Sequence, residues 1–449
     1  MIAGLNGKGK MKILFISPYP KDGNRHKNLH IPQLSLPILA GLTPPGHEIE
    51  IVEEPWDKIN FNEKYDLVGI TTMTATAPRA YEISTMFRGK GIKTILGGIH
   101  PTALPDESIK YADSVVIGEA ENIWDSVIKD VQKNDLRKFY KGEFPLLENS
   151  VMPRRDLIKR RAGAIGLAPV ETTRGCPYNC NFCSVTKFFG SRPRHKPIKE
   201  IIKDISTIKE KNLIFLDDNI TGDKQYARGL FKELKYMGKK WVGQSSINIV
   251  KDRELLKLAS ESGCCSFFVG LESVSTKGIK RYQKNLKSKE EIKEAIKMFL
   301  DVGILIYASL IFGFDNDGQS IFEETVEFLI ESRVAFTQLV LLTPYPGTKT
   351  FNDLQKEDRI VSYDWSKYNN LKLVFKPLGM TADQLLEGFH WARHKFDSFP
   401  SIIKRFWANR SHPILYTSVN LGSRYHSYNR KMQRDAFHRS IDVNFIYQR

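Results

Sequence analysis

Cysteine is scarce in this chain: there are only five among 449 residues. That number excludes a disulfide-stabilised secreted scaffold, which needs an even and denser set. Three of the five, Cys176, Cys180 and Cys183, lie close together in the sequence. Clustered thiols are typical of a reducing compartment and of metal binding. We therefore expect a cytoplasmic protein whose clustered cysteines bind metal.

Long apolar runs are also missing. The longest run, residues 302–314, falls short of the roughly 18 residues that a membrane-spanning helix needs. Gly303 and Gly313 interrupt it, so we interpret it as a buried strand. Residues 1–10 lack the apolar core of a secretory signal. We expect residues 1–10 to be a disordered tail and translation to start at Met11.

Acidic residues are outnumbered: 67 Lys and Arg stand against 51 Asp and Glu, which gives a net charge of +16. Residues 401–449 hold nine Lys and Arg but only two Asp. Such a basic surface can meet nucleic acid, anionic lipid or an acidic protein, or it can be solvated without a partner. We expect no nucleic-acid partner, and peripheral contact with a membrane stays open.

The first third of the chain alternates strands and helices. This pattern predicts a doubly wound, Rossmann-like α/β domain over residues 11–145 with a parallel sheet. Its ligand should lie at the carboxyl ends of the strands. The predicted strands are residues 12–18, 48–54, 66–74, 93–97 and 113–118, and the predicted helices are residues 33–42 and 78–89.

Residues 146–165 are polar, basic and interrupted by prolines, which is typical of a linker. Residues 166–365 then alternate again, and six βα units predict a partial (β/α)6 barrel of the TIM type. Residues 366–449 are expected to form a mostly helical C-terminal segment. The predicted barrel strands are residues 167–172, 212–217, 240–246, 266–271, 303–311 and 336–342, and the predicted helices are residues 197–210, 223–237, 251–262, 288–301 and 318–332.

The clustered cysteines follow the first predicted barrel strand with the spacing Cys-x3-Cys-x2-Cys. Three thiolates on one short loop can bind three irons of a [4Fe–4S] cluster and leave the fourth iron open. A structural zinc site normally has four protein ligands, and no fourth Cys or His lies at close spacing. The remaining pair, Cys264 and Cys265, begins the fourth predicted strand, at the end of a barrel away from its chemistry, so we interpret it as core packing.

The cysteine motif, with Phe182 directly before its third cysteine, resembles the signature of the radical S-adenosylmethionine (SAM) superfamily. The resemblance covers residues 166–350. It implies that the open iron binds the amino and carboxylate groups of SAM, and that one electron then splits the cofactor into methionine and a 5′-deoxyadenosyl radical.

The resemblance extends to acids at later strand ends. Asp217 and Asp218 match the place where the family contacts the SAM amino group, although the family often has Gly-Gly-Glu there, so which Asp acts stays open. Glu272 matches the ribose-binding acid. Gln244 and Ser246 are weaker candidates for the pocket wall. Residues 313–317 and 343–348 resemble loops that flank the adenine and the substrate, but simple turns explain them equally well.

Residues 11–145 resemble the cobalamin-binding domain of many radical enzymes. The matching residues are Thr71, Thr72, Gly97, Gly98, Ile99, His100, Pro101, Gly118, Glu119, Ala120 and Glu121. From the residues alone, only a doubly wound domain with a ligand at its glycine-rich edge follows. The Asp-x-His-x-x-Gly motif that supplies a lower imidazole is absent, and His26, His30 and His100 lack its context. We expect bound cobalamin without a histidine on cobalt.

The resemblance implies a cobalamin-dependent radical SAM methyltransferase that acts on an unactivated carbon. The alternatives are a related cyclase or oxidase without net methyl transfer, and a non-catalytic iron–sulfur redox sensor. A methylthiotransferase acting on RNA would need a second cysteine set, and none precedes Cys176. The expected partners are a small-molecule or lipid-like substrate and an electron donor such as flavodoxin or ferredoxin. The basic, aromatic C-terminal segment could close the barrel, cover its mouth or touch a lipid-like substrate.

Overall fold

A computed structural model describes residues 9–20, 31–54, 56–159, 166–282, 286 and 288–437. His26 and His30 lie outside these residues, as do most of the predicted tail, part of the predicted linker and the last twelve residues. Contacts group the chain into two compact units, which are described separately. Unit 1 comprises Met1–Asp218, Tyr345–Asn352 and Asp364–Asn369, and unit 2 comprises Asn219–Pro344, Asp353–Tyr363 and Asn370–Arg449.

Unit 1 begins with a parallel sheet of six strands in the order β2-β1-β3-β4-β5-β6. In β1, which lies between β2 and β3, Ile13 is in register with Ile49 of β2 on one side and with Leu67 of β3 on the other. The chain therefore runs outward in opposite directions from the middle of the sheet, as in a doubly wound fold. The strands are β1 (Lys12–Ser17), β2 (Glu48–Glu53), β3 (Leu67–Thr71), β4 (Lys93–Gly97), β5 (Ser114–Ile117) and β6 (Phe139–Lys141).

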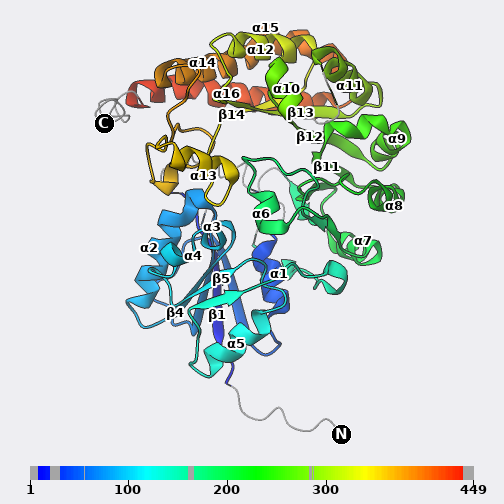
Figure 1. Ribbon diagram of the computed structural model, residues 1–449. Coiled ribbons are helices and arrows are strands. Elements are labelled where there is room, and N and C mark those ends of the chain that lie inside the picture. The colour runs from blue at the N-terminus through cyan, green and yellow to red at the C-terminus, as the bar shows by residue number, and fades with distance from the viewer. Residues whose placement is uncertain are drawn as a thin grey trace. The chain divides into compact units, whose positions relative to one another are not determined.

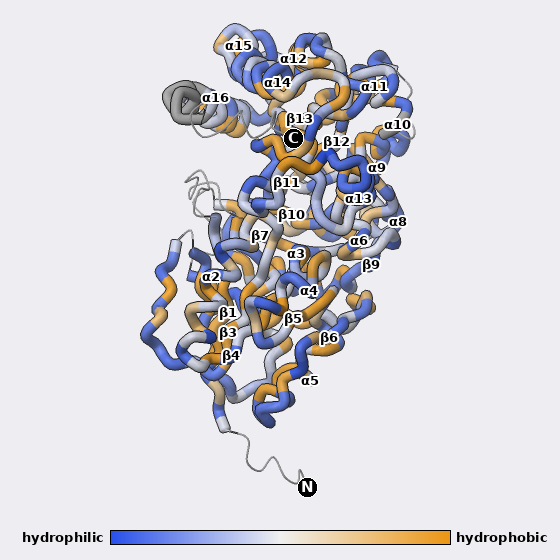
Figure 2. Tube along the Cα trace, turned by 60° about the vertical axis from the view of Figure 1, so that its left-hand side comes forward, coloured by the Kyte–Doolittle hydropathy of each residue, from blue (hydrophilic) through white to orange (hydrophobic). Residues whose placement is uncertain are grey.

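Helices cover both faces of this sheet (Figure 1). Its central strands are buried on both sides and read as hydrophobic runs, which Figure 2 shows in orange. On one face, Trp124 and Val127 pack with Phe15 and Leu36 in a single hydrophobic cluster. The helices are α1 (Ser35–Leu42), α2 (Ala77–Arg88), α3 (Ile99–Ala103), α4 (Pro105–Ser108) and α5 (Trp124–Gln132).

The six strands predicted for the barrel are all present. Within unit 1, β7 (Leu167–Val170) and β10 (Asn212–Phe215) pair in parallel. Within unit 2, parallel pairing joins β11 (Lys240–Ser245), β12 (Cys264–Glu272), β13 (Leu305–Phe312) and β14 (Phe336–Leu341) in that order. The helices between these strands in the sequence are α6 (Val185–Phe189), α7 (Ile198–Thr207), α8 (Lys224–Leu234), α9 (Arg253–Glu261), α10 (Thr276–Tyr282), α11 (Lys289–Asp301) and α12 (Ile321–Glu331), and α13 (Lys349–Lys356) follows the last strand.

Most strand and helix boundaries agree with the sequence predictions to within a few residues, and the fold class is confirmed. Sequence periodicity missed the short elements. These include a two-stranded antiparallel ribbon of β8 (Thr173–Arg174) and β9 (Arg194–His195), which flanks the cysteine loop. Two-residue strands are too short to show a period.

The C-terminal segment of unit 2 is helical, as predicted. It contains α14 (Ala382–Phe396), α15 (Phe399–Phe406) and α16 (Pro413–Phe437). Arg405 on α15 is fully buried, and its guanidinium donates to the carbonyls of Val334 and Ala335, at 2.9 and 2.7 Å. Arg405, which was counted in the predicted basic surface, is thus a core residue whose guanidinium donates to backbone carbonyls.

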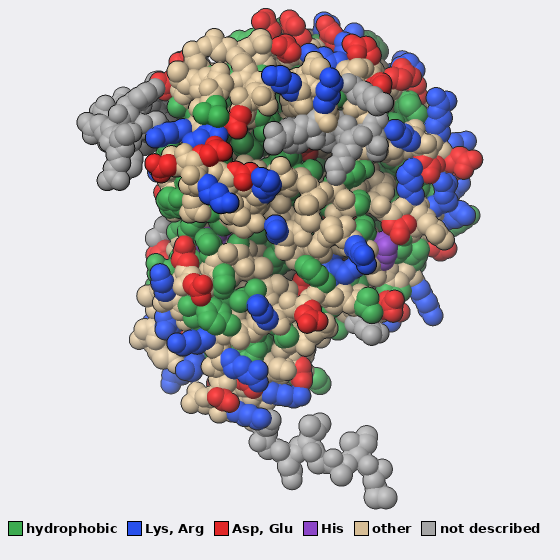
Figure 3. Space-filling view, in the orientation of Figure 1, with side chains coloured by type: hydrophobic (Ala, Val, Ile, Leu, Met, Phe, Trp, Pro, Cys, Tyr) green, Lys and Arg blue, Asp and Glu red, His purple; other side chains and the backbone are tan. Residues whose placement is uncertain are grey.

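Among the described residues, no helix is long and apolar enough to cross a membrane. On the face drawn in Figure 3, Lys and Arg side chains are interspersed with Asp and Glu.

Candidate cofactor site

The cysteine loop of unit 1 starts directly after the ribbon strand β8. Gly175 has φ of 92°, and a Cβ there would lie 2.7 Å from the carbonyl oxygen of Arg192, so only glycine fits this turn. Cys176, Cys180 and Cys183 are each partly buried, and none is in a disulfide. The Cys183 amide donates to the Cys180 carbonyl at 3.1 Å, which closes the second half of the loop.

The donor set of this loop fits an iron–sulfur cluster. The pKa of the Cys183 thiol is raised to about 12, mainly by burial and to a smaller extent by the nearby Cys180, Asp218 and Cys176. Such a group ionises only when a cation compensates it, as cluster irons do. In the described part of the chain, no three His, Cys, Asp or Glu side chains converge on one ion. A cubane does not require convergence, because each cysteine binds its own iron.

The two aspartates after β10 have different surroundings. Asp217 is buried, and its Oδ1 accepts from the hydroxyls of Thr172 and Thr173, at 2.5 and 2.7 Å, and from both their amides. Asp218 accepts from the Gly175 amide at 3.3 Å. Burial raises the pKa of Asp218 to about 7. The Asp217 carboxylate is therefore already hydrogen-bonded to Thr172 and Thr173. The Asp218 carboxylate faces the cysteine loop and has few donors or positive charges nearby to stabilise its ionised form.

Glu272 ends β12 in unit 2 with φ of 59°, a left-handed conformation that is rare for glutamate. The register of β12 against β13 shifts between Gly270 and Glu272, so the strand bulges at this point. A Cβ on Gly270 would lie 2.2 Å from Glu272 Oε1, so the glycine makes room for the carboxylate. Burial alone raises the pKa of Glu272 to about 7. Strain and an uncompensated acid at one strand end favour a functional role.

The weaker candidates in unit 2 are placed as follows. The Gln244 side chain is exposed at the end of β11. The backbone carbonyl of Gln244 accepts from the Ile220 amide at 2.9 Å. The Ser246 hydroxyl accepts from the Asn248 amide at 3.3 Å and caps the short helix η5 (Ile247–Lys251). In the 313–317 loop, Asp317 accepts from the amides of Gly313 and Phe314, which is turn chemistry.

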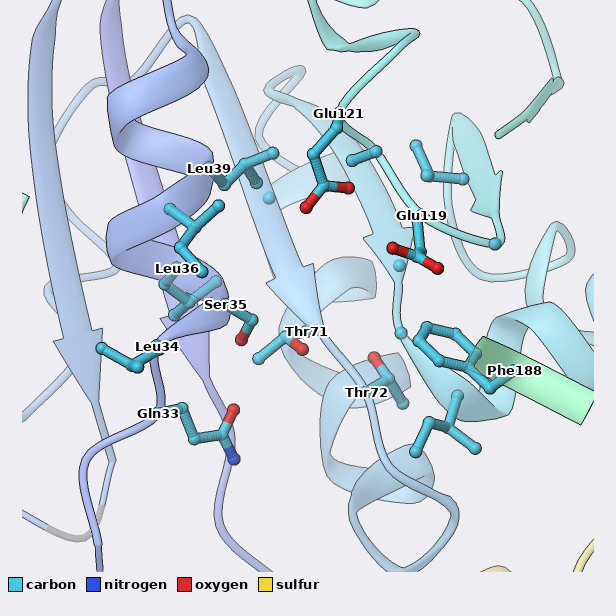
Figure 4. A pocket seen from close by; sticks show the side chains of 18 of the residues that line it. Gln33, Leu34, Ser35, Leu36, Leu39, Thr71, Thr72, Glu119, Glu121 and Phe188 are labelled. Carbon is cyan, nitrogen blue, oxygen red and sulfur yellow. The ribbon is translucent and has the colours of Figure 1, made fainter. Parts of the chain in front are cut away.

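A cavity of about 400 Å³ opens in unit 1 at the carboxyl ends of β3, β4 and β5, beside α1 (Figure 4). This is the edge where a doubly wound sheet binds its ligand. The wall is mostly apolar, with a few polar groups. The predicted residues that line it are Thr71, Thr72, Gly97, Gly98, Gly118 and Glu119, and Glu121, Glu171, Arg174 and Phe188 line it as well.

The backbone of the cavity wall requires two of its glycines. Gly98 and Gly118 have φ of 105° and 81°, and a Cβ on either would lie within 2.8 Å of a backbone oxygen, that of Thr72 or of Gly142. The Thr72 hydroxyl is buried on the wall and has no hydrogen-bond partner among the described residues. An orphaned donor of this kind suits a ligand with polar side groups. Cobalamin is such a ligand and is much larger than the cavity, so the cavity can receive one part of it.

His100 does not line this cavity. Its ring is fully buried, and its Nε2 lies 2.9 Å from the hydroxyl of Tyr81. Trp365 stacks edge-on against it at 5.3 Å and donates to Glu107 at 2.8 Å. Nδ1 of His100 has no partner among the described residues. The ring thus joins α3 to the short helix η6 (Trp365–Lys367) within unit 1.

Sequence reasoning missed a cluster of ion pairs beside the cavity. Arg174 donates to Glu119 and to Glu121, at 2.5 Å each, and Arg194 donates to both oxygens of Glu119. Arg174 also forms a fork with Glu171, at 3.0 and 3.1 Å. Burial opposes ionisation of Glu171, yet the charges of Arg174 and Lys196 lower its pKa to about 2. The sequence signals were the position of Arg174, two residues before Cys176, and the presence of Glu119 and Glu121 in the segment that resembles a cobalamin-binding domain.

Comparison with known proteins identifies both parts of the chain. Residues 170–329 match the radical SAM superfamily, and residues 36–128 match the B12 binding domain. In the structural comparison, the radical SAM methyltransferase TsrM from Kitasatospora setae, solved with cobalamin and a [4Fe-4S] cluster bound, superposes with a TM-score of 0.65 at 15% identity, covering 86% of this chain and 82% of that one. At that identity the likeness shows the fold.

Curated relatives are closer in sequence. The bacteriochlorophyllide d C-8(2)-methyltransferase of Chlorobaculum tepidum is 32% identical, covering 79% of this chain and 82% of its own length. The C-12(1)-methyltransferase of the same organism is 30% identical, covering 76% of each chain. More distant relatives include an anaerobic magnesium-protoporphyrin IX monomethyl ester cyclase from Cereibacter sphaeroides, at 25% identity, covering 66% of this chain and 53% of its own length.

Proposed function

Because this chain belongs to the family of cobalamin-binding radical SAM enzymes, we propose that it transfers a methyl group to an unactivated carbon of a bacteriochlorophyllide-type tetrapyrrole. The observation that carries the substrate class is the identity of 32% and 30% to two methyltransferases named for that macrocycle. Both matches extend over three quarters or more of each chain.

The family supplies the cofactors: a [4Fe–4S] cluster, SAM and cobalamin. When bound, the cluster delivers the electron that splits SAM, and cobalamin delivers the methyl group. Cys176, Cys180 and Cys183 would bind the cluster through thiolates. The cavity wall, with the Thr72 hydroxyl, would hold part of cobalamin. That cobalt carries no histidine stays a prediction, because His26 and His30 lie outside the described residues.

Two acids are proposed to bind the rest of SAM, each assigned from its own surroundings. We assign the SAM ammonium group to Asp218 rather than Asp217, because Asp217 already accepts from two hydroxyls and two amides. Asp218 keeps acceptor capacity beside the cysteine loop. Glu272 would accept from the ribose hydroxyls, and its bulge and left-handed backbone fix the direction of its carboxylate.

The test is a product assay with the reconstituted enzyme. Protein loaded anaerobically with iron, sulfide and hydroxocobalamin is given a reductant, SAM with a deuterated methyl group, and bacteriochlorophyllide d. We expect a product heavier by one labelled methyl group, together with 5′-deoxyadenosine. Formation of 5′-deoxyadenosine without a methylated macrocycle would contradict the substrate class and leave the radical chemistry standing.

A second candidate is ring formation, because cyclases stand among the relatives. The same mass measurement separates the two reactions: ring formation removes hydrogen from the substrate, and methyl transfer adds carbon. A non-catalytic redox sensor would form no 5′-deoxyadenosine at all. The electron donor is proposed to be a small redox protein such as flavodoxin or ferredoxin, which chemical reductant replaces in this assay.

A further inference from the structure

The ribbon beside the cysteine loop places two arginines opposite each other. Arg174 of β8 and Arg194 of β9 are cross-strand partners in the antiparallel register. Two like charges in this position repel each other. The carboxylate of Glu119, which follows β5, lies between them and accepts from both guanidinium groups. Glu119 therefore holds the ribbon to the sheet of the N-terminal domain.

The ion pairs form one buried network. Arg174 and Glu119 are only 7% and 4% exposed, so water screens their charges weakly. Arg194 also donates to the carbonyls of Pro145 and Phe189, at 2.8 and 3.0 Å. The network is electrically balanced, with three cations and three carboxylates: Arg174, Arg194, Lys196, Glu119, Glu121 and Glu171.

This network touches both cofactor regions of unit 1. Glu119, Glu121 and Arg174 line the cavity at the carboxyl ends of β3 to β5. Arg174 is also joined through one residue, Gly175, to the first cysteine of the loop. A ligand in the cavity and a cluster on the loop would thus both influence the position of the Arg174 guanidinium group.

We propose that Arg174 is a positioning residue whose ion pairs couple the two sites, so that bound cobalamin favours the cluster and the cluster favours cobalamin. Each ligand restricts the network to one arrangement, and the second ligand then meets a region that is already ordered. Because coupling between binding equilibria is reciprocal, both effects must be equal in size. The proposal rests on the family's cofactors and not on the substrate proposed above.

The test is a pair of binding titrations. The dissociation constant of hydroxocobalamin is measured anaerobically by quenching of tryptophan fluorescence, once with cluster-free protein and once with cluster-loaded protein. We expect cluster loading to tighten cobalamin binding about tenfold, within the usual range of coupling between sites. In the reciprocal measurement, hydroxocobalamin should slow the loss of iron to a chelator.

Two variants weaken the ion pairs of the network and keep a polar side chain at each position. Glu119→Gln keeps the shape of the side chain and removes the charge between the arginines, and Arg174→Lys keeps the charge and removes the fork. Arg155→Lys is the matched control, because Arg155 makes a similar two-point ion pair with Asp204, at 2.7 and 3.0 Å, in unit 1 but away from the cavity lining. We expect the tenfold effect to fall below about twofold in the first two and to persist in the control.

Thermal unfolding of every variant is measured alongside, because a merely structural network would lower the melting temperature and leave the ratio of dissociation constants unchanged. That outcome would overturn the proposal, and so would a ratio near one in the unaltered protein. If Glu119→Gln takes up no cluster, the milder Arg174→Lys decides. These readouts need no substrate, so their failure and a failure of methyl transfer are separate results.

Discussion

Glu272 gives a sharp prediction, because its carboxyl group is largely removed from water and has no cationic neighbour among the described residues. Burial raises its pKa from 4.5 to about 7. Between these values the unfolded chain loses the proton while the folded chain keeps it, so folding becomes less favourable as the pH rises. Above pH 7 the cost amounts to about 3 kcal/mol, or about 2 kcal/mol once the remaining water contact of the side chain is allowed for.

The substitution Glu272→Gln removes the charge and keeps the shape. In protein without cluster or SAM, we expect the variant to be more stable than the original by about 2 kcal/mol at pH 8, with the gain shrinking as the pH falls to 5. Urea unfolding at pH 5, 6.5 and 8 measures this difference. Glu254→Gln is the matched control, because that side chain is 90% exposed and should show no pH-dependent gain.

The same substitution should weaken SAM binding. A charged acceptor replaced by a neutral amide typically costs about 1.5 to 3 kcal/mol, so we expect roughly tenfold or greater loss of affinity in equilibrium dialysis of cluster-loaded protein. A stability gain that is the same at pH 5 and pH 8 would refute the reasoning on burial. Unchanged SAM affinity would refute the assignment of Glu272 to the ribose.

Three further predictions follow. Asp217→Ala should destabilise the fold by about 2 kcal/mol in urea unfolding, because the buried donors of Thr172 and Thr173 lose their acceptor; Asp218→Ala should fold normally and lose SAM affinity, and the reverse pattern would exchange their roles. Cys180→Ser should abolish the visible absorbance of the reconstituted cluster, because one iron loses its thiolate, while Cys264→Ser, buried at the start of β12, should retain it. Thr72→Val should leave the melting temperature unchanged or raise it, since the hydroxyl has no partner among the described residues, but should weaken hydroxocobalamin binding several-fold; unchanged binding would place that hydroxyl outside the cobalamin site.

The regular elements were predictable because their patterns are long. Strands buried on both faces read as apolar runs, and the alternation with helices fixed the parallel, doubly wound arrangement. The cysteine loop was found by its spacing, since three thiols within eight residues are rare by chance. Short elements such as the ribbon β8–β9 escaped, because two residues carry no periodicity.

Side-chain partners were beyond the reach of the sequence. Asp217 and Asp218 are adjacent and identical in type, and only the structure shows that the first is committed to Thr172 and Thr173. Arg405 counted as part of a basic surface, but its guanidinium is buried against backbone carbonyls. A sequence gives the net charge of a segment, but the effect of each charged side chain depends on the groups around it in the fold.

The pKa values of these acids therefore depend on how much positive charge lies near each carboxyl group, and not on where the acid lies in the fold. Glu171 has its own cations, Arg174 and Lys196, and its pKa falls to about 2 in spite of burial. Asp218 and Glu272 are also buried, but the described chain brings them too little positive charge, and their pKa values rise to about 7. A fold keeps an acid in such a state at a cost in stability, and that cost is recovered only by a ligand that brings positive charge or hydrogen-bond donors. The ammonium group that we assign to Asp218 and the ribose hydroxyls that we assign to Glu272 would supply such charge and donors.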